Sequence, residues 1–227
     1  MSTLALIHTS QVFLKVETMM QDLFAEIMPE VRLINIMDDS LLPDVVAEQR
    51  ILPEVTRRMC AYVVAAETAG ADAALSLCSS LGPAVDIARP LVRIPVIKID
   101  DAHTEKAVRE YRRIGAMATV ATTLGPTLDL LKEKAAALGK EVELHPSLSD
   151  RAFQVLMAGG REEHDDMVVD AARRLAPEVD VLLFCQASMA RLAPRVGQET
   201  GLTVLTSPRL AIEHTKRVLD ELVEAGT

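Results

Sequence analysis

The chain has 227 residues, of which 49% are apolar, 25% are charged and only 3% are aromatic. This composition is rich enough in Leu, Ile and Val to build a full hydrophobic core, so it excludes an intrinsically disordered chain. Lys and Arg number 24 against 33 Asp and Glu, which gives a net charge of −9. Such a surface repels phosphate backbones and anionic lipid, so we expect neither a nucleic-acid nor a membrane partner.

We expect a cytoplasmic protein without a signal peptide, because the first ten residues lack a basic segment and contain too short an apolar run. No apolar stretch of the sequence approaches the roughly 20 residues that span a bilayer. The three cysteines are an odd number, so we expect free thiols in a reducing compartment rather than a disulfide framework.

Short apolar runs alternate along the chain with longer amphipathic stretches. In chain order, the first expected strand, 3–8, precedes an expected helix at 11–27. The later strands are expected at 31–36, 72–77, 93–99, 115–120, 140–144, 179–184 and 202–206, and the later helices at 50–69, 81–89, 102–112, 125–138, 161–176, 188–199 and 208–224. Strands of about five residues between helices of ten or more are typical of parallel sheets with helical crossovers. The pattern therefore predicts an α/β fold.

Residues 72–110 and 180–218 resemble one another. In each, an acidic residue opens an apolar strand, a cysteine closes it, and a helix, a second β-rich run and another helix follow. The two cysteines, Cys78 and Cys185, are 107 residues apart, close to half the chain. This repetition predicts two similar α/β halves with parallel sheets, related by a pseudo-twofold axis and facing one another across a cleft. We expect one domain at 1–98 plus 208–227 and the other at 99–207.

Polar side chains follow the expected strands, where open α/β sheets bind their ligands. The candidate ligand-binding residues are His8, Ser10, Ser79, Ser80, Thr119, Thr122 and Gln186. Helix N-termini at this edge offer free N–H groups and a positive dipole end, and the hydroxyl groups add further donors. We therefore expect a small carboxylate ligand that needs no arginine clamp.

Cys78 and Cys185 are the candidate catalytic residues. As equivalent residues of two halves, they are expected to lie on opposite walls of one cleft. A helix N-terminus lowers the pKa of a thiol, so either group could act as a base near neutral pH. Two such groups can take a proton from one face of a carbon acid and return one to the other face, which is racemisation without a cofactor. The sequence contains no nucleotide-binding or zinc-binding pattern, so we expect neither a cofactor nor a metal.

Other ionisable groups are assigned structural roles. Cys60 lies in the helical pattern 50–69 and is expected in the core. The charged run 161–166 is expected to be a solvated helix start whose acids complement the helix dipole. His103 and His214 are each expected to be structural or surface residues.

Three segments carry a resemblance to a known family: SLCSSLG (76–82), GAMATVATT (115–123) and LLFCQASMARL (182–192). They resemble the Asp/Glu racemase superfamily of cofactor-independent enzymes, which includes aspartate, glutamate and hydantoin racemases, maleate isomerase and arylmalonate decarboxylase. The resemblance implies two flavodoxin-like domains, one catalytic cysteine from each, and a substrate carboxylate held by backbone amides and hydroxyls. We also expect a homo-oligomer, a dimer or a higher assembly.

The chain departs from the family pattern at three places. Cys78-Ser79-Ser80 stands where Cys-Asn-Thr is typical, and residues 184–187, Phe-Cys-Gln-Ala, stand where Gly-Cys-Thr-His is common. His8-Thr9-Ser10 replaces an Asp-Ser pair. The groups that recognise an α-amino group are therefore changed, so the substrate need not be a free amino acid.

These observations favour a racemase or epimerase that acts α to a carboxylate or amide carbonyl, on an amino acid, a hydantoin or a related small carboxylate. A maleate-type cis–trans isomerase, in which a cysteine thiolate adds to the double bond, uses the same residues. A non-catalytic protein that binds small carboxylates is the alternative from another class, and decarboxylation is a further enzymatic one.

Overall fold

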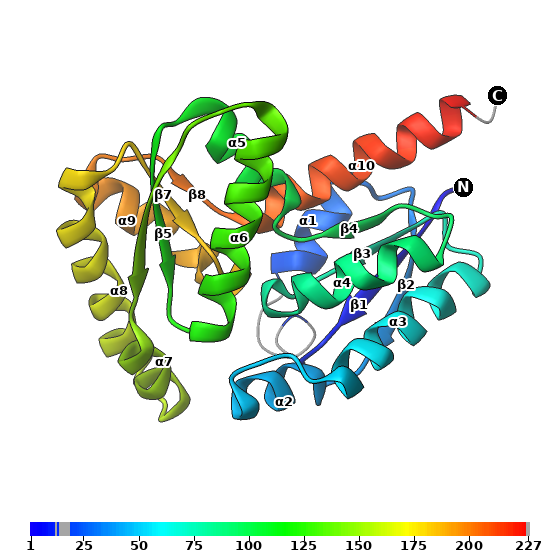
Figure 1. Cartoon of the computed structure of the whole chain (residues 1–227), viewed down its shortest axis with the longest axis horizontal. Helices are drawn as coiled ribbons and strands as arrows, with labels where there is room; N and C mark the ends of the chain where they lie inside the picture. The colour runs from blue at the N-terminus through cyan, green and yellow to red at the C-terminus, as the bar shows by residue number, and fades with distance from the viewer. Residues whose placement is uncertain (12, 14–18, 226–227) are drawn as a thin grey trace. The chain divides into compact units, whose positions relative to one another are not determined.

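The computed structural model describes residues 1–11, 13 and 19–225. The chain divides into two compact units, Met1–Ile99 with Pro208–Thr227, and Asp100–Ser207 (Figure 1). The boundary lies after Ile99, against an expected boundary after residue 98. Each unit holds one parallel sheet with helices on its faces, as predicted.

The first unit contains a four-stranded parallel sheet in the order β2-β1-β3-β4. The strands are β1 (Thr3–His8), β2 (Arg32–Met37), β3 (Ala73–Ser76) and β4 (Val96–Lys98), and the helices are α1 (Met19–Ile27), α2 (Leu41–Glu48), α3 (Pro53–Thr68), α4 (Gly82–Ala88) and α10 (Ser207–Ala225). β1 is buried along its whole length, as the central strand of a sheet covered on both faces should be. One face packs its small and branched side chains, such as Ala5, Ile7 and Ala74, against α3 and α4.

The second unit repeats this arrangement with a sheet in the order β6-β5-β7-β8. The strands are β5 (Arg113–Ala118), β6 (Glu143–Leu148), β7 (Val181–Phe184) and β8 (Val204–Leu205), and the helices are α5 (Asp101–Glu110), α6 (Ala121–Leu138), α7 (Asp150–Met157), α8 (Arg161–Leu175) and α9 (Ala193–Thr200). Successive residues of β7 enter different cores: Leu182 and Phe184 pack with α8 and α9, whereas Val181 and Leu183 pack with α5 and α6. This alternation is the two-residue period of a strand.

The last helix of each repeat belongs to the other unit. α5 follows β4 of the first sheet but is part of the second unit, and α10 follows β8 but lies, from Pro208, in the first unit. Ion pairs attach α10 to the α1 segment: Arg209 to Glu26 at 2.8 Å and Lys216 to Glu30 at 3.2 Å. The two halves of the sequence are thus connected by an exchange of helices.

Two helices were not expected from the sequence. α2 buries only Leu41 and Val45, and α7 buries only Ala152, so neither shows the repeated apolar stripe that identifies an amphipathic helix. The expected strand 115–120 begins earlier, at Arg113. The expected helix 11–27 is α1 from Met19, and its residues 12 and 14–18 lie outside the described residues.

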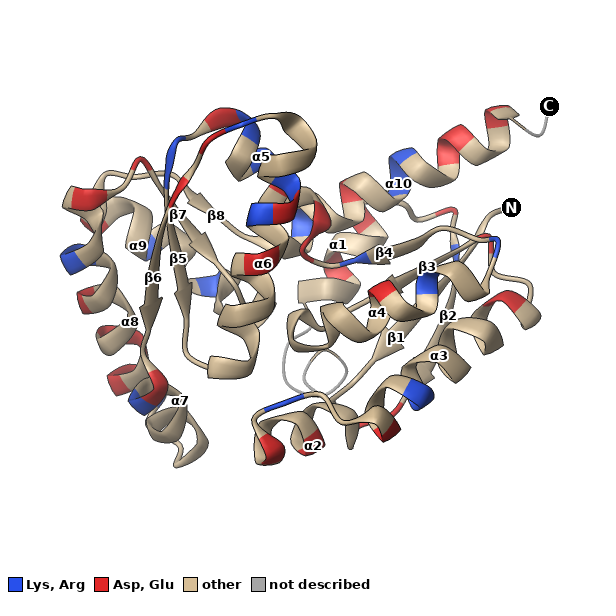
Figure 2. Ribbon diagram, in the orientation of Figure 1, with Lys and Arg blue, Asp and Glu red and all other residues tan. Residues whose placement is uncertain are grey.

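Charged side chains lie mainly on the helices, and β1, β3 and β7 contain none (Figure 2). Among the described helices, none is long and apolar enough to cross a membrane.

Candidate active site

In each unit, the predicted residues lie at the carboxyl edge of the sheet. In the first unit, His8 ends β1, Ser10 follows it, and Cys78 precedes a short 3-10 helix that begins with the buried Ser79 and Ser80. In the second unit, Thr119 follows β5, Thr122 lies in the first turn of α6, and Gln186 precedes the 3-10 helix Ala187–Leu192. The candidate ligand-binding residues of each unit therefore gather at one edge, where the topology predicts a ligand.

Gln186 is held by the segment that follows β5. Its Oε1 accepts hydrogen bonds from the backbone N–H groups of Thr119 at 2.6 Å and Val120 at 3.1 Å. Its Nε2 donates to the Thr119 hydroxyl at 3.1 Å. Val120 is the N-cap residue of α6, so these N–H groups belong to a helix start that would otherwise be open to a ligand. A carboxylate or carbonyl oxygen would find suitable donors in the place that the Gln186 oxygen occupies.

The sheet register corrects the expected equivalence of the two cysteines. β1 pairs with β3 so that Ile7 lies opposite Ser76, and β5 pairs with β7 so that Met117 lies opposite Phe184. One residue further on, the Leu77 N–H donates to the Ile7 carbonyl at 3.1 Å, and the Cys185 N–H donates to the Met117 carbonyl at 2.9 Å. Cys185 therefore corresponds to Leu77.

The residue that corresponds to Cys78 is Gln186. Both residues are the N-cap of a 3-10 helix and have similar backbone angles, φ −141° and ψ 114° for Cys78 and φ −119° and ψ 127° for Gln186. Both accept a hydrogen bond from the residue three positions later, Leu81 at 3.3 Å and Met189 at 3.0 Å. The expectation that Cys78 and Cys185 are equivalent is wrong by one residue. Because strand side chains alternate between the two faces of a sheet, a shift of one residue places the Cys185 side chain on the opposite face from the one expected.

Cys185 is a buried core thiol. Its side chain packs with Val181 and Leu183 on the α5 and α6 side of the sheet and is hydrogen-bonded to Thr127. Burial, reinforced by the negative charge of Asp100, raises the pKa of the Cys185 thiol far above its ordinary value. The expectation of a lowered pKa is therefore not met at Cys185. Cys78, by contrast, is half-buried and packs against the edge of the α3 and α4 core.

Lys98 brings a buried positive charge to the same face of the sheet as Ser76. The two residues lie opposite one another in the β3–β4 pair, and the Lys98 Nζ lies 2.8 Å from a carboxylate oxygen of Asp86 on α4. The lysine stem lies close to Gly82, the first residue of α4, since a Cβ there would make an ordinary van der Waals contact of 3.5 Å with Lys98 Cδ. This ion pair fixes α4, which follows the Cys78 segment, against the sheet.

His8 is buried and neutral. Its Nε2 lies 2.8 Å from Asn35 Oδ1, and its Nδ1 has no hydrogen-bond partner among the described residues. Burial lowers the pKa of His8, an effect that the bond to Asn35 only partly offsets. Because the Asn35 oxygen accepts, Nε2 carries the proton and Nδ1 presents a lone pair. His8 also lines an apolar cavity of about 240 Å³ together with residues such as Phe24 and Leu77.

Replacing Asn35 with Asp is expected to raise the pKa of His8 by about one unit or more, because a carboxylate favours the imidazolium form. The His8 ring signals in an NMR titration measure this change. Gln154→Glu, the same amide-to-acid change at an exposed position of α7, is the matched control and should leave His8 unchanged. An equal His8 titration in the parent and Asn35→Asp would contradict the assigned hydrogen bond.

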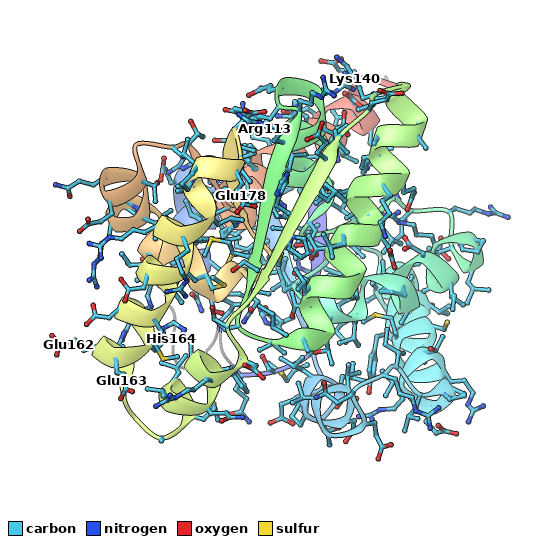
Figure 3. All side chains as sticks on the ribbon, turned by 60° about the vertical axis from the view of Figure 1, so that its left-hand side comes forward. Arg113, Lys140, Glu162, Glu163, His164 and Glu178 are labelled. Atoms are coloured by element: carbon cyan, nitrogen blue, oxygen red, sulfur yellow. The ribbon has the colours of Figure 1, made fainter. Side chains whose placement is uncertain are left out.

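Two histidines of the second unit are buried: His164, and His103, for which a structural role was one of the expectations. His164 was expected in a solvated helix start, but it is buried and bonds Asp165 at 2.7 Å. Figure 3 shows Glu162 and Glu163 projecting outward at the start of α8, whereas His164 lies on the inner side. The Asp165 carboxylate also accepts hydrogen bonds from Nη1 and Nη2 of Arg191, each at 2.5 Å. This ion pair anchors the segment after β7.

His103 is fully buried on α5 beside the end of β7. Its ring nitrogens lie near the carbonyl groups of Phe184 and Asp100, without forming hydrogen bonds of good geometry with any described residue. Burial lowers the pKa of His103 to about 4. The sequence signal for this position was its place in the first turn of the helix after β4, beside two acidic residues.

The part of the chain that the structure describes contains no group of three His, Cys, Asp or Glu side chains suited to a metal ion. Two four-stranded parallel sheets with flanking helices and polar strand ends define an α/β protein of two flavodoxin-like units. The profile of the Asp/Glu/Hydantoin racemase family matches residues 12–215, so the chain belongs to this family.

Solved structures share the fold at low sequence identity. A putative Asp/Glu racemase from Yersinia pestis is 16% identical with a TM-score of 0.75, covering 98% of this chain and 100% of that one. A glutamate racemase isoform from Bacillus anthracis is 15% identical with a TM-score of 0.72, covering 97% and 82%. An allantoin racemase from Klebsiella pneumoniae is 18% identical with a TM-score of 0.65, covering 100% and 89%. No curated protein sequence matches the chain.

Proposed function

We propose that this chain is a cofactor-independent racemase or epimerase that exchanges the proton on a carbon α to a carboxylate or amide carbonyl. The observation that carries the proposal is the half-buried Cys78 at a strand end, among donor side chains, in a chain of the racemase family. The substrate class is an amino acid, a hydantoin or a related small carboxylate. We also propose that the protein is cytoplasmic and that it forms a homo-oligomer, a dimer or a higher assembly.

The proposed chemistry needs a base and a stabilised carbanion. The Cys78 thiolate takes the Cα proton, the electrons of the C–H bond pass to the carbonyl oxygen, and the S–H group later returns a proton. Hydrogen-bond donors directed at that oxygen stabilise the charge that develops there. The hydroxyl and N–H groups at the strand ends of the same unit, including those of Ser79 and Ser80, are the proposed donors.

In the two-cysteine form of this mechanism, Cys185 is the acid or base on the opposite face of the substrate. That role requires a thiol that reaches the substrate and changes its protonation state during turnover. Cys185 is fully buried with a raised pKa, and its side chain lies on the other face of the strand from the position that matches Cys78. The half-buried Cys78 alone would suffice for the alternative function, a cis–trans isomerase that works through a thiol adduct.

Incubation in D2O with separate enantiomers of aspartate, glutamate and allantoin tests the proposal. The expected result is loss of the Cα–H signal in proton NMR for at least one probe, because proton abstraction exposes the carbanion to solvent deuterium. The Cys60→Ser variant removes a thiol of α3 and is the matched control that should behave like the parent. Conversion of maleate to fumarate, with no exchange at Cα in any probe, would contradict the racemase proposal and favour the isomerase.

A further inference from the structure

We infer that Gln186, and not Cys185, takes the place of Cys78 in the second unit, so that this chain moves its proton with a single thiol. This inference rests on the proposed function and identifies the groups that perform it. The side-chain positions on the two corresponding strands follow from the strand register and the backbone geometry, and each unit defines these separately.

The first support is the face on which each side chain lies. Ala74 and Cys78 belong to the core of α3 and α4. Leu182, which corresponds to Ala74, belongs to the equivalent core of α8 and α9, and so does Phe184, one residue before Cys185. Cys185 instead belongs to the opposite core, with α5 and α6. Bringing its sulfur to the other face would rotate the end of β7 and break the hydrogen bond from its N–H to Met117, which is 2.9 Å long.

The second support is the spacing of residues that anchor the two strands. Asp72 accepts a hydrogen bond from the Thr3 N–H at 2.7 Å, and Asp180 accepts one from the Arg113 N–H at 2.8 Å. The N–H groups of the two aspartates donate back to the carbonyl groups of Thr3 and Arg113, each at 2.8 Å. These aspartates open corresponding strands, and Cys78 and Gln186 each lie six positions after them.

A glutamine changes what this position can do. A carboxamide neither takes nor returns a proton near neutral pH, whereas a thiol does both. The Gln186 oxygen instead accepts the two N–H groups of Thr119 and Val120, whose counterparts in the first unit are those of Thr9 and Ser10. Gln186 is therefore a positioning and binding residue rather than an acid or base.

The consequence is a one-sided proton exchange. Cys78 Sγ takes the proton from the face of the substrate that it contacts, the C–H electrons move to the carbonyl oxygen, and the S–H proton exchanges with solvent. Return of the proton from the same sulfur restores the original enantiomer with a solvent hydrogen. Inversion requires a proton donor other than a thiol on the opposite face, so it is slower than exchange.

Alkylation of the native protein tests the placement without any substrate. With iodoacetamide and peptide mass spectrometry, Cys78 is expected to react while Cys185 stays protected until the protein is unfolded. In the double variant Cys185→Ser/Gln186→Cys, the new thiol is expected to become reactive. The control Cys185→Ser/Ser188→Cys adds a thiol two residues further along. Alkylation of Cys185 as fast as Cys78 in the native parent would overturn the inference.

Deuterium exchange with an active probe tests the chemistry. Because a positioned acid–base group is worth about 10²–10⁴-fold, Cys185→Ser/Gln186→Cys is expected to speed interconversion of enantiomers by about 10-fold or more relative to Cys185→Ser. Both Cys185→Ser and Cys185→Ala are expected to keep exchange within about two-fold of the parent. Loss of exchange in both, with unchanged circular dichroism and thermal unfolding, would overturn the inference. If no probe exchanges, the proposed function fails, whereas the alkylation pattern still decides the placement.

Discussion

Replacing Cys78 with serine is expected to lower the rate of Cα proton exchange by at least about 10²-fold, because the thiol is the proposed acid–base group and a serine hydroxyl is a far weaker acid. The substitution is nearly isosteric and the residue is half-buried, so the fold is expected to remain intact. Deuterium wash-in measured by NMR on a probe that the parent exchanges gives the rate.

Cys60→Ser is the control for this experiment, because Cys60 is also half-buried in the first unit but lies within α3. It should keep the rate of the parent. Exchange by Cys78→Ser at the parental rate, with the control equally active, would show that neither thiol of this unit is the base and would remove the residue on which the proposed mechanism depends.

Acidification is expected to destabilise the protein through His103. The ordinary pKa of 6.5 falls to about 4 in the fully buried side chain, so the unfolded chain binds a proton at a pH where the folded chain does not. The stability that this neutral histidine contributes is fully present above pH 6.5 and is lost as the pH falls toward 4. The shift corresponds to about 3 kcal/mol of unfolding free energy over that range.

The variant His103→Gln should have a flatter dependence of the unfolding free energy on pH between 6.5 and 4. Urea unfolding at several pH values measures it, and comparison of slopes within each variant removes the general cost of altering a buried residue. An unchanged slope in His103→Gln would contradict the assigned pKa shift.

The α/β fold could be predicted because most strands are short apolar runs between helical stretches. β6 (Glu143–Leu148) is the exception, because its sequence ELHPSL is not an apolar run and the expected strand, 140–144, overlaps it only at its start. β1 agrees with its expected range because all six residues are buried and a polar segment follows directly. α2 and α7 could not be predicted, since each is short and buries one or two side chains, too few to show a helical period. Strand ends depended on backbone pairing, as at Arg113, whose carbonyl accepts a hydrogen bond from the Asp180 N–H at 2.8 Å.

The candidate site could be predicted as a set of strand-end positions but not as a set of roles. Matching cysteine to cysteine set the repeat at 107 residues, whereas the strand-opening aspartates, Asp72 and Asp180, are 108 apart and were the better anchor. A difference of one residue in the repeat assigns each side chain to the opposite face of the strand. Neither the burial of Cys185 nor the neutral state of His8 is visible in a linear pattern. The first depends on packing with α5 and α6, and the second on burial and on the bond to Asn35 of β2.

The fate of a single enantiomer in D2O tests the central claim most directly. The starting material is one enantiomer of a probe that the parent protein exchanges, and mass spectrometry after chiral separation follows deuterium in both enantiomers. A single thiol at Cys78 predicts that the recovered starting enantiomer gains deuterium faster than the opposite enantiomer forms. Formation of a deuterated opposite enantiomer, while the recovered starting enantiomer keeps its proton, would contradict this account and show that two groups act on opposite faces.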